Sequence, residues 1–196
     1  MPWPVTVIAA IVVRLLITGA LHEDGLADFI DGFGAGGDRD RILAIMKDSH
    51  IGTYGVLGLI LYMLLLATAL FCMPVAEAAL TILAADPFSK MVTSQLVSML
   101  PYARREDQAK NKTIYRKPSL AAGLSLSVQG LLPMALMIWL TGITWYLVVI
   151  IPAVVMYVLY LLMLRKINGY TGDCCGAVCL LVELTVCLIA CSQLGQ

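Results

Sequence analysis

The stretch ITWYLVVIIPAVVMYVLYLLML, residues 143–164, decides the fold class of this chain. It contains no Asp, Glu, Lys or Arg, and a helix that crosses a bilayer needs about 20 consecutive, mainly apolar residues. The chain as a whole is also apolar, since 60% of its 196 residues are hydrophobic and only 13% are charged. In soluble domains about a quarter of the residues are charged. The sequence therefore predicts an all-α integral membrane protein.

Further apolar runs on both sides of this stretch predict a polytopic bundle of about six transmembrane helices. The third run is the weakest, because Glu77, Asp86, Pro87 and Lys90 interrupt it. No internal repeat is visible, so residues 1–196 are expected to form a single integral membrane domain. The six expected crossings are residues 3–21, 52–73, 75–100, 119–140, 143–164 and 174–194.

The basic residues predict the orientation of these crossings. Three polar segments, residues 22–51, 101–118 and 165–173, hold 11 of the 13 Lys and Arg. With six crossings these segments all lie on one side, which the positive-inside rule makes the cytoplasm, and the N-terminus lies outside. The net charge is zero, which predicts no general attraction to nucleic acid.

The first polar segment begins with an acidic motif, LHEDGLADFIDGF at residues 21–33. Asp24, Asp28 and Asp31 are spaced i, i+4, i+7, which places them within about 60° on one face of a helix. The motif therefore predicts an amphipathic, acidic helix at the cytoplasmic surface. Its apolar face comprises Leu26, Phe29, Ile30 and Phe33.

Three carboxylates on one stripe repel one another. Neighbours on a helix face lie about 5–6 Å apart, where two unit charges at an effective dielectric of about 20 repel by roughly 3 kcal/mol. A bound hard cation relieves this repulsion, with Mg²⁺ favoured and Mn²⁺ or Ca²⁺ as alternatives; a solvated acidic face is the other interpretation. Gly25 and Gly32 disfavour a helix and indicate close approach of another backbone or of a bulky substrate.

A second block follows the acidic motif. The residues FGAGG at 33–37 break the helix, and Asp38 is expected to cap a second helix over residues 39–47. That helix leads into KDSHIGTYG at residues 47–55. A glycine-rich turn with Lys and Ser beside carboxylates suits a phosphate group bridged by metal, although an ordinary junction between a helix and a span has the same composition.

Ionisable residues inside the expected spans are functional candidates. Asp86 and Lys90, at i and i+4, either pair with each other or leave Lys90 to reach a substrate phosphate. Glu183 is expected to face the bundle interior, either as a functional group or as half of a structural pair. The six cysteines are interpreted as small packing residues rather than as metal ligands or disulfides.

Three blocks of the sequence resemble the motifs of one known family. HEDGLADFIDG at 22–32 resembles the signature of the cobalamin synthase family, H-x-D-G-L-A-D-x-x-D-G. IMKDSHIGTYG at 45–55 resembles its second block, I-M-[KR]-D-S-x-x-G-T-x-G, and TGDCCGA at 171–177, followed by Glu183, resembles T-G-D-x-x-G-A…E. The blocks occur in the family order and extend from about residue 22 to the end of the chain.

The resemblance implies an adenosylcobinamide-GDP ribazoletransferase. Such an enzyme joins α-ribazole, or its 5′-phosphate, to adenosylcobinamide-GDP, releases GMP, and so completes vitamin B12 or its 5′-phosphate. The family is Mg²⁺-dependent and lies in the cytoplasmic (inner) membrane. The resemblance therefore implies an active site that faces the cytoplasm, and association with other B12-assembly enzymes is also expected.

On this chemistry we expect two sets of site residues. The metal ligands are expected to be carboxylates from both ends of the chain, with Asp28 or Asp31 also acting as the catalytic base that takes the hydroxyl proton. The expected metal ligands are Asp24, Asp28, Asp31 and Asp173. The expected substrate contacts are Lys47, Asp48, Ser49, Gly52, Lys90 and Gly172.

Two other functions compete with this interpretation. Residues 28–35 match the start of the CDP-alcohol phosphotransferase pattern, D-x-x-D-G-x-x-A-R, but Gly36 replaces its arginine. A small transporter would use Asp86, Lys90 and Glu183 as a pathway at the membrane midplane. The strongest motif, however, lies at the expected membrane surface, which favours an enzyme.

The chain also departs from the family pattern at two places. Glu23 stands where the family usually has an apolar residue, which leaves open how a metal is coordinated there. Family members normally carry additional hydrophobic sequence before the acidic motif. The resemblance therefore implies a chain shortened at its N-terminus.

Overall fold

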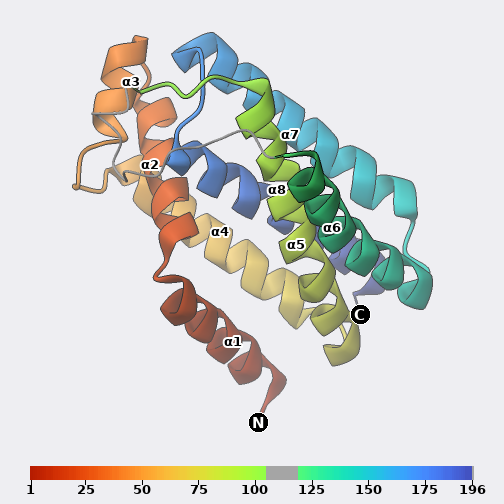
Figure 1. Cartoon of the computed structure of the whole chain (residues 1–196). Coiled ribbons are helices and arrows are strands. Elements are labelled where there is room, and N and C mark those ends of the chain that lie inside the picture. Colours follow the sequence, from red (N-terminus) through yellow and green to blue (C-terminus); the bar gives the residue numbers. More distant parts are fainter. Residues whose placement is uncertain (105–118, 196) are drawn as a thin grey trace.

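The computed structural model describes residues 1–104 and 119–195, and these residues form a bundle of helices (Figure 1). Within these two ranges the only β contact is an isolated bridge between Tyr102 and Tyr170. The prediction of an all-α protein is confirmed. The helices are α1 (Trp3–Thr18), α2 (Leu21–Ala35), α3 (Arg39–Ile45), α4 (Thr53–Phe71), α5 (Val75–Met99), α6 (Leu120–Thr141), α7 (Trp145–Ile167) and α8 (Gly172–Leu194).

Each of the six expected crossings coincides with a helix, but not every helix has the length and apolarity of a span. Among the described residues α4, α6, α7 and α8 do, and the count reaches five if α1 and α2 together form one bent span. α5, which carries Glu77, Asp86 and Lys90, is not among them. The structure thus supports a polytopic membrane protein with four to five such spans, against the six expected.

A sharp bend separates α1 from α2. The two helices meet at 89°, because Gly19 and Ala20 both adopt left-handed backbone conformations, with φ of 62° and 54°. A left-handed residue after the last turn ends a helix, so the first expected crossing stops at Thr18 instead of residue 21. In Figure 1 α1 projects from the bundle, whereas α2 packs into it.

Helix α8 forms the centre of the bundle. In its most apolar 18-residue window 67% of the residues are buried, compared with 17–28% in the other three spans. It contacts α2, α4, α5 and α7, whereas α6 and α7 expose large apolar side chains such as Trp139 and Tyr157. These outer faces suit contact with lipid, because a bilayer solvates apolar side chains.

The polar segments before α4, after α5 and between α7 and α8 meet at one end of the bundle. Arg39 donates from Nε to the Ile167 carbonyl oxygen at 3.0 Å and from Nη2 to the Ala103 carbonyl oxygen at 2.5 Å. Nη2 of Arg104 lies 3.4 Å from the carbonyl oxygen of Leu43. The described parts of the three segments that the charge pattern placed on one side of the membrane lie together, and residues 105–118 of the second segment lie outside the described residues.

Candidate functional site

Close packing of α2 against α8 builds the site. A Cβ atom on Gly25 would lie 3.0 Å from the carbonyl oxygen of Asp173, and one on Gly176 would lie 3.0 Å from the carbonyl oxygen of His22. Only glycine allows two backbones to approach this closely without a shift. The expectation that Gly25 marks a close backbone contact is confirmed, and the contact brings the start of α2 beside the start of α8.

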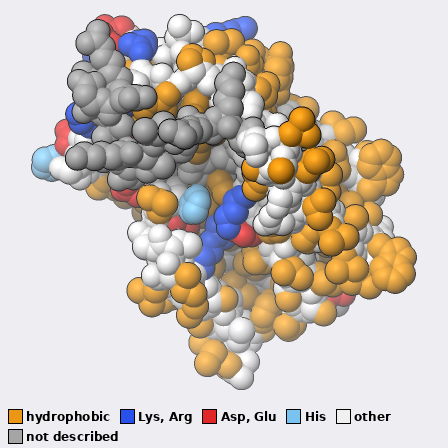
Figure 2. Space-filling view, in the orientation of Figure 1, with side chains coloured by type: hydrophobic (Ala, Val, Ile, Leu, Met, Phe, Trp, Pro, Cys, Tyr) orange, Lys and Arg blue, Asp and Glu red, His pale blue; other side chains and the backbone are white. Residues whose placement is uncertain are grey.

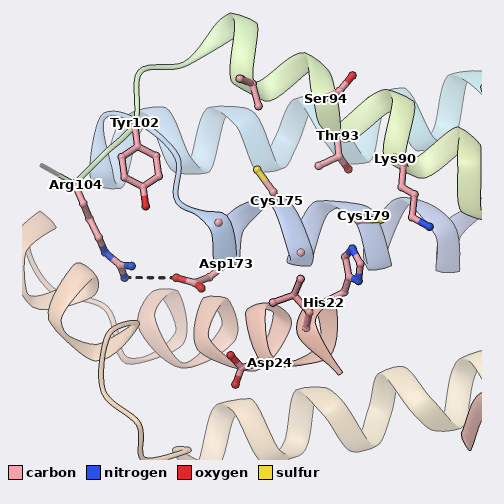
Figure 3. Close-up of a pocket in the computed structure, with 14 residues that line it drawn as sticks. His22, Asp24, Lys90, Thr93, Ser94, Tyr102, Arg104, Asp173, Cys175 and Cys179 are labelled. Carbon is pink, nitrogen blue, oxygen red and sulfur yellow. Dashed lines mark ion pairs between the residues drawn. The ribbon is translucent and has the colours of Figure 1, made fainter. Parts of the chain in front are cut away.

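A cavity of about 440 Å³ lies between α2, α5 and α8, and we call it the central pocket. Asp24 on α2 and Asp173 at the start of α8 both line it. Figure 3 shows Arg104 reaching toward Asp173, with the Asp24 carboxylate on the other side of the α2 ribbon. On the surface in Figure 2, basic, acidic and histidine side chains form a strip within hydrophobic surroundings. The polar and thiol side chains that line the central pocket are His22, Asp24, Lys90, Thr93, Ser94, Tyr102, Arg104, Asp173, Cys175 and Cys179.

Arg104 and Asp173 form an ion pair on the wall of the central pocket. The distance from Arg104 Nη2 to Asp173 Oδ2 is 3.5 Å, and the two side chains are only 4% and 12% exposed. The Nε atom of Arg104 is buried and has no hydrogen-bond partner among the described residues. Thr171 caps α8 by accepting from the Cys174 amide at 3.3 Å, so Asp173 stands in the first turn of that helix.

Two further side chains give the central pocket hydrogen-bond donors. Burial raises the pKa of the Tyr102 hydroxyl above its ordinary value, so this group stays protonated at neutral pH and can donate. Lys90 Nζ pairs with Asp86 at 2.6 Å and also lines the pocket. The expected ion pair between Asp86 and Lys90 is therefore present. Lys90 still lies on the wall of the central pocket, where its ammonium group could reach a phosphate.

Asp31 lies elsewhere and has a structural role. Its side chain accepts hydrogen bonds from the backbone amides of Gly52 at 2.7 Å and Gly55 at 2.8 Å, and the residue is only 7% exposed. A Cβ atom on either glycine would collide with the Asp31 carboxylate. The glycine-rich turn expected to receive a phosphate thus receives a carboxylate of the first motif, which ties α2 to the start of α4.

The structure does not gather Asp24, Asp28 and Asp31 into one group. Asp24 is exposed, Asp28 is half-buried and Asp31 is buried. In residues 1–104 and 119–195 no three His, Cys, Asp or Glu side chains lie close enough together to hold a metal ion. The carboxylates that share a pocket are Asp24 and Asp173, which lie far apart in the sequence.

The remaining expected substrate contacts are divided among different places. Gly172 lines the central pocket. Lys47 lines a second cavity of about 670 Å³ beside α3. Asp48 and Ser49 are exposed, and the hydrogen bond from the His50 amide to Asp48 lowers the pKa of that carboxyl group.

Several residues of this region were not expected from the sequence. Arg39 and Arg104 contributed only to the predicted orientation of the spans. The position of Arg104, three residues after Pro101, is a signal that it stays near the end of α5. Arg14 was also missed: it binds Glu183 of α8 through two contacts of 2.6 and 2.7 Å. The expectation that Glu183 faces the interior is confirmed, because its exposure is 0%.

The predicted cap of the second short helix is confirmed, and Cys174, Cys179 and Cys187 are buried. Asp38 accepts from the Arg41 amide at 2.9 Å and caps α3, which ends at Ile45 rather than at residue 47. All six cysteines lie within the described part of the chain and are free thiols. Neither a disulfide nor a group of metal-binding size involves them.

The fold and the pocket together define a class of protein. It is a polytopic α-helical membrane protein with a pocket lined by carboxylate and basic side chains at the end where its polar segments meet. The model of the family described as cobalamin-5-phosphate synthase matches residues 1–191. The chain belongs to this family.

Curated relatives cover nearly the whole chain. An adenosylcobinamide-GDP ribazoletransferase of Shewanella frigidimarina is 36% identical over 194 residues, which are 96% of this chain and 72% of the relative. The enzyme of the same name from Vibrio cholerae serotype O1 is 36% identical over 191 residues, which are 94% of this chain and 70% of the relative. No solved structure matches the chain.

Proposed function

We propose that this protein is an adenosylcobinamide-GDP ribazoletransferase. It transfers the cobinamide phosphate group of adenosylcobinamide-GDP to α-ribazole or α-ribazole 5′-phosphate, and it releases GMP. The observation that carries the proposal is the central pocket, in which Asp24 of the first motif and Asp173 of the third line one cavity beside Lys90 and Arg104.

The reaction is a phosphoryl transfer. A ribose hydroxyl of the acceptor attacks the phosphorus atom that carries cobinamide, a new P–O bond forms, and the bond to the bridging oxygen breaks so that GMP leaves with it. Such reactions depend mainly on positioning and on neutralising the charge of the phosphates. Lys90 and Arg104 provide positive charge at the pocket wall, and the Tyr102 hydroxyl provides a hydrogen-bond donor.

We assign the base to Asp28 rather than to Asp31. Both oxygen atoms of the Asp31 carboxylate already accept backbone amides, from Gly52 and Gly55, so this side chain is engaged between α2 and the start of α4. Asp28 lies one turn beyond Asp24 on α2 and is half-buried. In this role its carboxylate takes the proton that the acceptor hydroxyl loses.

The donor atoms of the central pocket fit a Mg²⁺ ion that binds together with substrate. Mg²⁺ is usually held by one or two carboxylates while water and phosphate oxygens complete its coordination. Asp24 and Asp173 would hold the ion, and their location in one pocket supports this assignment. When bound, Mg²⁺ neutralises negative charge on the diphosphate.

The proposed location is the cytoplasmic membrane, with the central pocket facing the cytoplasm. The described parts of the polar segments meet beside the pocket, and in the sequence these three segments contain 11 of the 13 Lys and Arg. The positive-inside rule places such segments in the cytoplasm. A cysteine-labelling experiment at exposed residue Ser49, performed in intact cells and in inverted vesicles, tests this orientation.

GMP release by the purified full chain tests the function. We expect release that requires adenosylcobinamide-GDP, an α-ribazole acceptor and Mg²⁺, and that stops on chelation and in the Asp28→Asn variant. Release of CMP from a CDP-linked donor would instead identify a CDP-alcohol phosphotransferase. GMP release that survives both chelation and loss of Asp28 would refute the metal and base assignments.

A further inference from the structure

The second cavity has no role in the proposed reaction so far, and we call it the basic pocket. It measures about 670 Å³ and lies between α3 and the residues that follow α5. The described residues that line it contribute three basic side chains, Arg39, Lys47 and Arg104, and the carboxylate of Asp40. Asp40 forms an exposed ion pair with Arg39 at 3.4 Å, and exposed ion pairs contribute little to stability. Among these residues positive charge is in excess.

Arg104 belongs to both cavities. It lines the central pocket and the basic pocket, as does Tyr102 beside it, so the two cavities are neighbours that share a wall. A group bound in one cavity is therefore within reach of a molecule bound in the other. Two adjoining cavities suit a reaction that joins two large substrates.

The guanidinium group of Arg104 has hydrogen-bond donors that its contacts do not use. Its Nη2 atom lies 3.5 Å from Asp173 Oδ2 and 3.4 Å from the Leu43 carbonyl oxygen, whereas charge-assisted N–H···O bonds are usually about 2.7–2.9 Å long. Its Nε is buried and has no hydrogen-bond partner in the part of the chain that the structure describes. Buried donors are nearly always satisfied, so an additional acceptor is expected here.

We propose that Arg39, Lys47 and Arg104 form a phosphate-binding subsite in the basic pocket, distinct from the carboxylate wall of the central pocket. Arginine presents a planar fork of donors that matches phosphate oxygens, and lysine adds a point charge. When a phosphate enters, Arg104 turns its donors toward it and the Asp173 carboxylate keeps its place in the central pocket. This inference rests on the proposed function and assigns a substrate group to its second cavity.

The chemistry of the subsite fits a phosphate from either substrate. The guanosine diphosphate of the donor and the 5′-phosphate of an α-ribazole phosphate acceptor present the same oxygen atoms. Binding of the donor would place GMP in the basic pocket as it leaves. Binding of the acceptor would make the subsite a determinant of preference for the phosphorylated acceptor.

Binding of radiolabelled pyrophosphate to the purified full chain, measured by equilibrium dialysis, tests the subsite without turnover. We expect Lys47→Gln and Arg39→Gln each to weaken binding at least fivefold. Lys47 tests the charge without structural damage, because it is exposed, whereas Arg39 also holds two backbone carbonyls. The matched controls are Arg41→Gln on the same helix and Lys166→Gln at the end of α7, both exposed and outside the two pockets, and they are expected to bind as the parent does.

Kinetics with two acceptors then identify the source of the phosphate. If Lys47→Gln raises KM only for α-ribazole 5′-phosphate and not for α-ribazole, the subsite binds the acceptor. If it raises KM for adenosylcobinamide-GDP with both acceptors, the subsite binds the donor. Either result supports the subsite.

The proposal is overturned if the parent protein does not bind pyrophosphate, if both variants bind it as tightly as the parent, or if the controls weaken binding as much as they do. The proposed function can fail independently of this result. A protein that binds pyrophosphate through Lys47 but releases no GMP retains the subsite and loses the assigned reaction. A protein that releases GMP but binds pyrophosphate equally well without Lys47 retains the assigned reaction and loses the subsite.

Discussion

Two arginine–carboxylate pairs of this protein differ in how fully their charges are satisfied. Inside the bundle, Arg14 of α1 grips Glu183 of α8 through two contacts of 2.6 and 2.7 Å. At the central pocket, Arg104 meets Asp173 through one contact of 3.5 Å. The first geometry is the bidentate fork that makes arginine pairs specific, whereas the second leaves donors for another acceptor. The Arg14 guanidinium joins two helices, whereas the Arg104 guanidinium keeps a buried Nε donor without a partner among the described residues and is suited to a ligand.

Asp31 extends this comparison. Like Glu183 it is buried and doubly bonded, in its case to the amides of Gly52 and Gly55. Asp24 and Asp173 instead lie on the wall of a cavity. These carboxylates thus divide into those that join helices and those that line the central pocket, and four substitutions test this division.

The largest effect is expected from Glu183→Ala. It leaves the Arg14 guanidinium without its partner inside the bundle, and breaking a buried pair costs about 3–5 kcal/mol. We expect a large fall in the thermal midpoint of the detergent-solubilised protein. The double variant Arg14→Leu/Glu183→Leu should recover most of the loss, because no charge is left buried. Equal stability of the single variant and the parent would show that this ion pair does not stabilise the bundle.

Gly25→Ala should separate α2 from α8. The added methyl group would lie 3.0 Å from the carbonyl oxygen and 3.1 Å from the Cα atom of Asp173, and overpacking against backbone costs about 1–3 kcal/mol. We expect lower stability together with a greater loss of GMP release. The control is Gly123→Ala in α6, where nothing lies within 4 Å of the added atom, and where alanine should favour the helix by up to about 1 kcal/mol. Equal effects at the two positions would contradict the close-packing argument.

Asp31→Asn should lower stability rather than catalysis. The Asn amide has a single acceptor oxygen, so the backbone amide of either Gly52 or Gly55 loses its partner, and we expect this loss to cost about 1–2 kcal/mol. We expect a lower thermal midpoint with GMP release per folded molecule close to that of the parent. The comparison is Asp28→Asn, which should abolish release with little change in the midpoint. The opposite pattern would move the catalytic base to Asp31.

The smallest effect is expected from Arg104→Lys. The charge stays but the planar fork is lost, so we expect GMP release to fall about tenfold, which corresponds to about 1.4 kcal/mol in the activation free energy. The thermal midpoint should hardly change, because the 3.5 Å contact with Asp173 contributes little. Unchanged GMP release would show that the guanidinium geometry has no part in the reaction.

Local features of the sequence predicted the fold and parts of the site. Apolar length alone predicted the long helices, because the bilayer sets the number of residues that a span needs. The charge pattern predicted which segments lie together, and Gly25 and Asp38 signalled a close contact and a helix cap. Each of these signals is contained within a few neighbouring residues or follows from the membrane itself.

The remaining features depend on contacts that no local pattern contains. Arg14 and Glu183 are 169 residues apart, and the local sequence around either residue does not indicate that the two form an ion pair. Asp31 lies 21 and 24 residues from Gly52 and Gly55, whose amides its carboxylate accepts at the start of α4, and the spacing of the three aspartates does not indicate this contact. The left-handed conformation of Ala20 also gave no signal, since alanine normally favours a helix.

Helix α8 carries both kinds of carboxylate. Asp173 stands in its first turn and Glu183 stands ten residues further on, a separation of about 15 Å along the helix axis. One continuous helix therefore joins the ion pair that anchors α1 to a carboxylate on the wall of the central pocket. A substitution that shifts α8 at Glu183 is expected to move Asp173 as well.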